Sequence, residues 1–356
     1  MINQLISLLR NYYCYSIEFI NMGIITNMVR IKKNIALVWI TILLLVINSN
    51  MLIAQDVQFS QLFSDRLYLN PAYAGTDYCP RIMVSYRNQW PGVQFPYVTY
   101  SVSYDQYSEI VHGGLGIRMM KDDQGGGVFS MLNADFIYAY KVKINSNISL
   151  KLALEASIYQ RSVNANDLVF ADMIDSRFGV VFPNSESINI QAIFTPDFSA
   201  SMLFNYKKYF FGVNVSHIPQ SIVAEHNLIL PMKITAHIGA AFPIIKNDSK
   251  SSSYILEPNV VYIQQQNFNM LYYGMYFDIS SIALGVFFRQ DLKLHYDALV
   301  LSFHMDVKQF KIGYSYDATL SSFFGHSLGT HEISLSYLFN CRKKIKDYST
   351  ISCPVF

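Results

Sequence analysis

Charged residues are scarce in this sequence of 356 residues, because Asp, Glu, Lys and Arg make up only 15% of it. A typical soluble domain carries about 25% of these residues. The formal net charge is only +2, which gives no support to nucleic-acid binding. Aromatic residues are abundant by contrast, with 26 Tyr and 25 Phe. This balance favours a chain that meets lipid or a large protein partner.

The sequence also lacks an apolar run long enough to cross a membrane as a helix. The strongest run covers only residues 35–47 and follows a basic stretch at Arg30, Lys32 and Lys33. This order predicts a secretory signal peptide over residues 28–54, cleaved between Ala54 and Gln55; an uncleaved anchor helix is the alternative. Residues 1–27 then read as an upstream extension, with Met28 as the true start.

Beyond residue 80, amphipathic-helix patterns are absent and alternation with period two recurs. In residues 97–105, for example, Val98, Tyr100 and Val102 share one face and oppose Thr99 and Ser101. Such a pattern indicates strands with one apolar and one polar face.

Fourteen segments carry this alternation: 81–89, 97–105, 113–121, 130–143, 147–161, 198–206, 209–218, 232–244, 254–266, 268–279, 281–290, 297–307, 309–319 and 330–340. Most are longer than the roughly five or six residues of a globular strand, and long enough to cross hydrocarbon when tilted. Connections after odd-numbered segments are mostly long and those after even-numbered segments mostly short, with residues 265–267 as the clear exception.

Long strands in even number, a leader and alternating connection lengths predict an all-β fold, an antiparallel outer-membrane β-barrel of about 14 strands over residues 81–340. Backbone groups in hydrocarbon must pair within the protein, which strands achieve only in a closed barrel. Both termini are then expected in the periplasm, with a periplasmic N-terminal segment at 55–80 and a C-terminal tail at 341–356. A secreted soluble sandwich remains the alternative, because alternation suits it as well.

Three motifs resemble a known family. They are Gln58-Phe59-Ser60-Gln61 with residues 69–75 (LNPAYAG), residues 86–90 (YRNQW), and residues 113–116 (GGLG). Together they look like the PorP/SprF membrane proteins of the type IX secretion and gliding machinery of Bacteroidetes. The resemblance implies an outer-membrane barrel that works with secretion components and, in some members, with a large surface adhesin. The pair Asp65-Arg66 departs from the pattern, since apolar residues are expected there.

Residues 58–75 combine a turn signal with several aromatic side chains. Asn70-Pro71 stops regular structure and Gly75 permits a turn. The aromatic residues Phe59, Phe63, Tyr68 and Tyr73 could plug the lumen or dock a periplasmic partner; plain packing beneath the barrel is the alternative.

No candidate for enzymatic or metal chemistry stands out. The oxygen-rich loop with Asp172 and Asp175 lacks the spacing of a calcium loop. Ser216 and His217 are adjacent, and neighbouring strand residues point to opposite faces, so we expect no nucleophile–base pair. We therefore expect no enzyme, no cofactor and no metal. A polar lumen is expected from the charged residues Arg87, Asp105, Lys121, Lys141, Lys151, Glu155 and Arg161.

Of four cysteines, Cys14 lies in the expected upstream extension, which leaves Cys79, Cys341 and Cys353. Cys79 precedes the first strand and Cys341 follows the last, so a disulfide between them would staple the seam of a closed barrel. Cys341 could instead pair with Cys353 and clip the basic tail, and all three pairings stay open.

The sequence thus predicts a non-enzymatic outer-membrane component of type IX secretion. Its expected partners are outer-membrane lipid, secretion components and a surface adhesin, with no nucleic acid. An outer-membrane diffusion channel or hydrophobic-solute transporter is the alternative.

Overall fold

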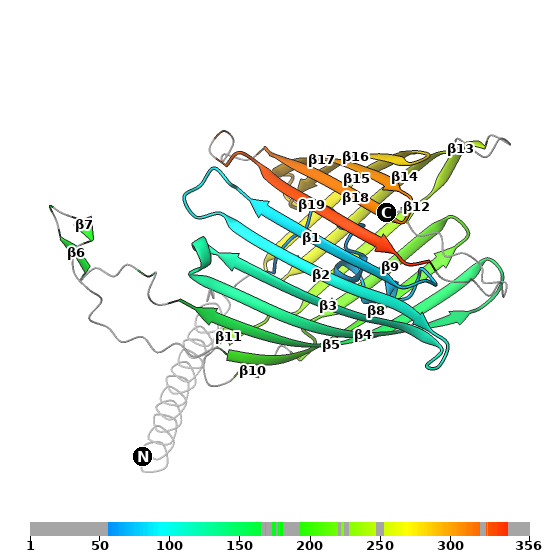
Figure 1. Cartoon of the computed structure of the whole chain (residues 1–356), viewed down its shortest axis with the longest axis horizontal. Helices are drawn as coiled ribbons and strands as arrows, with labels where there is room; N and C mark the ends of the chain where they lie inside the picture. The colour runs from blue at the N-terminus through cyan, green and yellow to red at the C-terminus, as the bar shows by residue number, and fades with distance from the viewer. Residues whose placement is uncertain are drawn as a thin grey trace, which may run out of the picture. The chain divides into compact units, whose positions relative to one another are not determined.

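In a computed structural model, the chain forms one large barrel (Figure 1). The structure describes residues 56–164, 168, 173–175, 177, 179–180, 193–219, 222–223, 228–246, 253–320, 325 and 327–340. The expected upstream extension, the signal peptide, the tail from residue 341 and the residues Cys14, Cys341 and Cys353 lie outside this range, as does Asp172. Within the described residues, no helix is long and apolar enough to span a membrane.

The barrel wall contains long antiparallel strands. They are β1 (Arg81–Gln89), β2 (Tyr97–Ser108), β3 (Gly113–Gln124), β4 (Phe129–Lys143), β5 (Ile148–Val163), β8 (Ile193–Tyr206), β9 (Tyr209–Ser216), β12 (Lys233–Ala240), β13 (Phe242–Lys246), β14 (Ser253–Gln265), β15 (Phe268–Ile279), β16 (Ile282–Gln290), β17 (Tyr296–Val307), β18 (Phe310–Thr319) and β19 (Thr330–Leu338). Two short hairpins, β6 (Ile174–Asp175) with β7 (Gly179–Val180) and β10 (Ile222–Val223) with β11 (Leu228–Ile229), lie in the connections.

Two pairings close the ring. β1 pairs with β19 along its whole length, from Arg81 opposite Leu338 to Gln89 opposite Thr330. β12 and β13 both pair with β14 and act as one strand interrupted at residue 241. Counted in this way, the barrel has fourteen strands, and the expected fold class is confirmed.

Side chains alternate along each strand between an apolar outer surface and a polar lumen. On β5, Leu154 is 66% exposed whereas its neighbour Glu155 is buried. Large apolar side chains cover the outside, and Ser, Thr, Asn and charged side chains line the inside. Lys121 was expected in the lumen, and this is wrong: it lies on the outward face of β3 and pairs with Asp123 at 2.8 Å near the strand end.

The two ends of the barrel differ in their connections. We call the end with residues 109–112, 144–147, 207–208, 280–281 and 308–309 the turn end. The opposite end, with residues 90–96, 164–192, 217–232 and 320–329, we call the loop end. β1 begins and β19 finishes at the turn end, where Phe339 N donates to Pro80 O at 2.9 Å.

Candidate functional site in the barrel lumen

Residues 56–80, which we call the lumen segment, lie inside the barrel and not beneath it (Figure 1). Residues 55–80 were expected as a periplasmic segment that plugs the lumen or docks a partner, with packing beneath the barrel as the alternative; the described residues 56–80 occupy the lumen. The segment contains a short helix α2 (Arg66–Leu69) and a 3-10 turn η1 (Pro71–Tyr73). Its apolar side chains are almost fully buried: Phe59, Leu62, Phe63, Leu67, Leu69, Ala72, Tyr73 and Ala74. Burial of each Phe or Leu side chain is favourable by roughly 1.5–3 kcal/mol in free energy relative to exposure. Apolar burial therefore strongly favours the position of the segment inside the barrel.

The lumen segment runs the length of the barrel, from the loop end to the turn end. At the loop end, Asp56 N donates to Oε1 of Gln265, the last residue of β14, at 3.1 Å. At the turn end, Tyr78 Oη donates to Oε1 of Glu109 at 2.5 Å, in the connection between β2 and β3. The chain therefore passes down through the lumen before β1 rises back along the wall.

A buried ion network fixes the segment near the loop end. Arg87 on β1 contacts Glu332 on β19 at 3.0 Å and Asp317 on β18 at 3.5 Å. Ser60 joins this network, because its hydroxyl donates to Asp317 at 2.5 Å and its backbone N–H donates to Glu332 at 2.8 Å. Gln61 N also donates to Glu332, at 3.2 Å. Buried charges need such partners, since an unpaired buried charge is costly.

Aromatic contacts hold the middle of the segment. Phe63 packs edge-on against Phe210 of β9 and Tyr276 of β15, with ring centroids 6.4 and 6.3 Å apart. The Tyr73 hydroxyl is 3.1 Å from His237 Nε2 on β12, and the two rings stack. Phe59 packs edge-on against Tyr68 within the segment itself.

Asn70 caps η1 and also reaches the wall. Its side-chain oxygen accepts a hydrogen bond from Ala72 N at 2.9 Å, and its amide nitrogen donates to Met202 O at 3.0 Å. Pro71 follows at the first position of η1, where its missing N–H costs nothing. The Asn-Pro pair thus starts a turn that points one amide at the backbone of β8.

Gly75 of the lumen segment packs directly against Gly114 on the wall strand β3. Gly75 has a positive φ of 61°, and a Cβ on it would lie 2.6 Å from the Gly114 Cα. A Cβ on Gly114 would lie 2.0 Å from the carbonyl oxygen of Ala74. The same turn is held by Lys151, whose ammonium donates to Ala74 O at 2.7 Å, and by Asp105, which accepts from Gly75 N at 2.9 Å. Only glycine on both sides permits this approach.

The unexpected pair Asp65-Arg66 is buried and hydrogen-bonded. Ser101 on β2 donates to Asp65 at 3.0 Å, and Arg66 contacts Asp77 at 3.3 Å. Burial raises the pKa of Asp65 above its usual range, although the Arg118 charge and the Ser101 hydrogen bond oppose this shift. Apolar residues were expected at these two positions. Instead, Asp65 contacts the barrel wall through Ser101, and Arg66 contacts Asp77 within the lumen segment.

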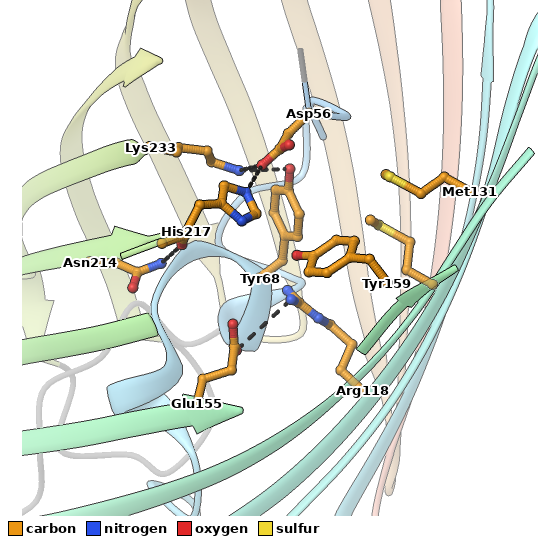
Figure 2. A pocket seen from close by; sticks show the side chains of 11 residues that line it. Asp56, Tyr68, Arg118, Met131, Glu155, Tyr159, Asn214, His217 and Lys233 are labelled. Carbon is orange, nitrogen blue, oxygen red and sulfur yellow. Dashed lines mark hydrogen bonds and ion pairs between the residues drawn. The ribbon is translucent and has the colours of Figure 1, made fainter. Parts of the chain in front are cut away.

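A second charged cluster holds the loop-end start of the segment (Figure 2). We call Asp56, His217 and Lys233 the anchor cluster. Asp56 contacts His217 Nε2 at 3.0 Å and Lys233 Nζ at 3.1 Å, and the other ring nitrogen of His217 lies 2.9 Å from Asp197. Tyr68 also accepts from Lys233 at 3.1 Å.

The charges in the anchor cluster reinforce one another. Burial alone would raise the pKa of Asp56, but Lys233 and His217 outweigh it and hold that pKa well below the usual range. Burial would likewise lower the pKa of His217, but Asp56 and Asp197 raise it to about 9. With a carboxylate on each ring nitrogen, His217 is an imidazolium and not a general base.

A cavity of about 20 Å³ lies beside this cluster (Figure 2). It is lined by Arg118, Glu155, Tyr159 and Asn214 together with the cluster. This is the room of a single water molecule. Among the described residues, no group of three or more His, Cys, Asp or Glu could hold a metal ion.

Ser216 and His217 do not point to opposite faces of the barrel wall. Strand alternation predicted opposite faces, but β9 ends at Ser216 and His217 has a φ of 60°, so alternation does not extend to it. Both side chains are buried in the lumen. The His217 ring nevertheless bonds Asp56 and Asp197, and Asn214 donates to the Ser216 hydroxyl at 3.1 Å.

Sequence reasoning proposed seven residues as plug or partner contacts: Phe59, Phe63, Tyr68, Asn70, Pro71, Tyr73 and Gly75. The structure places all seven inside the lumen. It adds three further contact residues, Ser60, Gln61 and Asp56. Ser60 and Gln61 were noted only as part of the QFSQ motif, and Asp56 was not noted at all. Cys79 is disulfide-bonded; its pairing with Cys341 or Cys353 stays a prediction, because both lie outside the described residues.

The three motifs noted in the sequence contact one another in pairs, at the two ends of the lumen. Ser60 of the QFSQ motif accepts a hydrogen bond from Arg87 of the YRNQW motif at 2.7 Å. Gly75 of LNPAYAG touches Gly114 of GGLG. Against this background, the profile of the family described as type IX secretion system membrane protein PorP/SprF matches residues 52–337. The chain belongs to the PorP/SprF family.

Other comparisons add little to the PorP/SprF assignment. The comparison with curated proteins found no match. Among solved structures, similar chains include the Ralstonia pickettii toluene transporter TbuX, at 9% identity and a TM-score of 0.45, covering 77% of this chain and 93% of that one. Another is the P. putida toluene transporter TodX, at 10% identity and a TM-score of 0.44, with the same coverages. Likenesses this low carry no argument about function.

We expect Gly114→Val to displace the lumen segment, because the new side chain would overlap the Ala74 carbonyl. The measurement is proteinase K cleavage within residues 56–80 of the purified barrel, followed by mass spectrometry. Leu115→Val is the matched control, since Leu115 faces outward on the same strand. Equal protection of the segment in both variants would contradict the close packing described here.

The anchor cluster predicts a pH dependence of stability. Because folding raises the pKa of His217 from 6.5 to about 9, its contribution is complete below pH 6.5 and is lost as the pH rises to about 9. The loss amounts to roughly 3 kcal/mol in the free energy of unfolding. Folding lowers the pKa of Asp56, so its contribution is lost instead as the pH falls below about 4.

Denaturant unfolding in lipid vesicles at pH 6 and pH 9.5 would measure this loss. His217→Gln should flatten the dependence, whereas His295→Gln, at an exposed position in the connection after β16, should not. A His217→Gln protein with the wild-type pH profile would refute the role of the imidazolium.

Proposed function

We propose that this PorP/SprF protein is a non-enzymatic outer-membrane component of the type IX secretion machinery. It assists export or surface attachment of a large adhesin-type substrate through protein contacts. The observation that carries the proposal is the lumen filled by the chain's own segment, in a member of a secretion-system family. A barrel whose lumen is occupied end to end is suited to a scaffold more than to a conduit.

The alternative, a diffusion channel or hydrophobic-solute transporter, needs a path through the wall or the lumen. The side chains of Phe63, Leu67 and Tyr73 occupy that lumen with at most 1% exposure. Near the loop end, Ser60 N donates to Glu332 and Asp56 pairs with Lys233, so buried polar contacts also hold the start of the segment. Opening a solute path would require breaking these buried contacts together.

We also propose the outer membrane as the location, with the loop end facing outward. Barrels of this type place short turns in the periplasm and long loops outside. The end of β19 is then periplasmic, which agrees with the position expected for the C-terminus. We also propose that a signal peptide at residues 28–54 directs export. Asp56, however, sits at the loop end, so the start of the lumen segment would reach the outer mouth. This differs from the expectation that both termini are periplasmic.

The secretion role predicts the surface and secreted proteome of a deletion strain. We expect loss of one large adhesin, restored by the wild-type gene and not by Gly114→Val, if the filled lumen matters for partner contact. Loss of every type IX substrate would make the protein a core component. An unchanged proteome would overturn the secretion role and favour transport.

The orientation predicts which end of the lumen segment is accessible on intact cells. A Val57→Cys variant should react with a membrane-impermeant maleimide above the level of the parent chain, because Val57 is only half-buried at the loop end. Thr76→Cys is the matched control: it is half-buried as well but lies near the turn end. Labelling of Thr76→Cys alone would reverse the proposed orientation.

A further inference from the structure

The turn between β8 and β9 carries two adjacent lysines at the turn end of the barrel. Lys207 and Lys208 are both exposed. Their side chains lie back along aromatic rings: Lys207 Nζ is 5.5 Å from the ring centroid of Tyr206, and Lys208 Nζ is 4.4 Å from that of Phe242. Cation–π contacts of this kind orient an ammonium group but leave its hydrogen-bond donors available.

The rings that receive these lysines belong to the outer face of the barrel. Tyr206 and Tyr209 are 41% and 47% exposed and follow the outward positions of β8 and β9. Tyr209 packs edge-on against Phe242 at 5.9 Å. Tyrosines in such positions mark the boundary between hydrocarbon and lipid headgroups. The two ammonium groups therefore lie at headgroup depth and on the lipid side of the rim.

The backbone of this turn is held from both sides. Lys207 N donates to Asn147 O of the neighbouring turn at 3.0 Å, and Ala241 N donates to Lys208 O at 3.0 Å. The two lysines thus start from fixed positions, which lowers the entropy cost of binding a ligand.

Among the described residues, no carboxylate lies on the strands on either side of this turn near its lysines. Residues 136–154, 198–219 and 228–246, which include the turn-end parts of β5, β8, β9, β12 and β13, contain no Asp or Glu. Other lysines near the strand ends pair with acids: Lys121 with Asp123 at 2.8 Å and Lys311 with Asp306 at 3.4 Å. In the part of the chain that the structure describes, Lys207 and Lys208 form no ion pair.

We propose that Lys207 and Lys208 bind the phosphate of an anionic phospholipid in the leaflet at the turn end. The lipid's acyl chains would lie along the outward residues Phe204 and Phe211, which are opposite each other on β8 and β9. A zwitterionic headgroup fits less well, because its own ammonium would meet the two lysines. The inference rests on the membrane-spanning barrel and not on the proposed role in secretion.

Native mass spectrometry of the purified full chain, titrated with phosphatidylglycerol or phosphatidylethanolamine, tests this site. A lysine that contacts the headgroup of a bound anionic lipid contributes about fivefold in affinity, whereas a rim lysine away from that lipid contributes nothing to this site. We therefore expect Lys207→Gln/Lys208→Gln to weaken phosphatidylglycerol binding by roughly 25-fold. Lys308→Gln, in the turn between β17 and β18, is the matched control and should bind as the wild type does.

Three results would overturn the site. They are unchanged phosphatidylglycerol binding by the double variant, an equal loss in Lys308→Gln, and equal binding of both lipids by the wild type. Heat-modifiable mobility in gels checks that each variant is folded. If the double variant does not fold, the two single variants and the wild-type comparison between the lipids decide the question.

Discussion

A closed ring of strands encloses a lumen, and filling that lumen is the constraint on which the rest of this structure depends. Backbone pairing in hydrocarbon forces closure, here through β1 with β19 and β12 with β14. Closure with fourteen strands leaves space for more than the inward side chains. The chain fills it with residues 56–80, so wall and lumen segment form one packed unit.

The contacts of the lumen segment divide the work between apolar and charged groups. Phe63 and Leu67 supply apolar burial, which favours any position inside. Ser60 and Asp56 determine where the segment lies along the barrel axis, because the charged partners of each lie at one position along that axis. Apolar burial thus keeps the segment in, and the ion networks decide where it stops.

A filled lumen also shapes the functional proposals. In the proposed role, protein partners would bind at the rims and loops, because residues 56–80 of the chain itself occupy the interior. The lipid-facing surface keeps its own chemistry, as the aromatic and lysine contacts around residues 206–209 show. Secretion partners and membrane lipids would therefore meet different parts of the same wall.

Much of the wall was predictable, since alternation depends only on the two-residue period of a strand. The expected segment 268–279 coincides with β15, and 81–89 with β1. Alternation failed at His217, where the strand had already ended, and the inward assignment of Lys121 overlooked its parity with Leu115 and Ile117.

The sequence by itself determined the strands, their two faces and the family motifs, because these are local patterns. Only the tertiary structure decided that Ser60 meets Arg87 and that Gly75 meets Gly114. Closure of the ring brings those residues together, and no local pattern encodes their distance. The direction of the lumen segment, from the loop end to the turn end, was decided in the same way, by charged partners that lie more than 150 residues further along the chain.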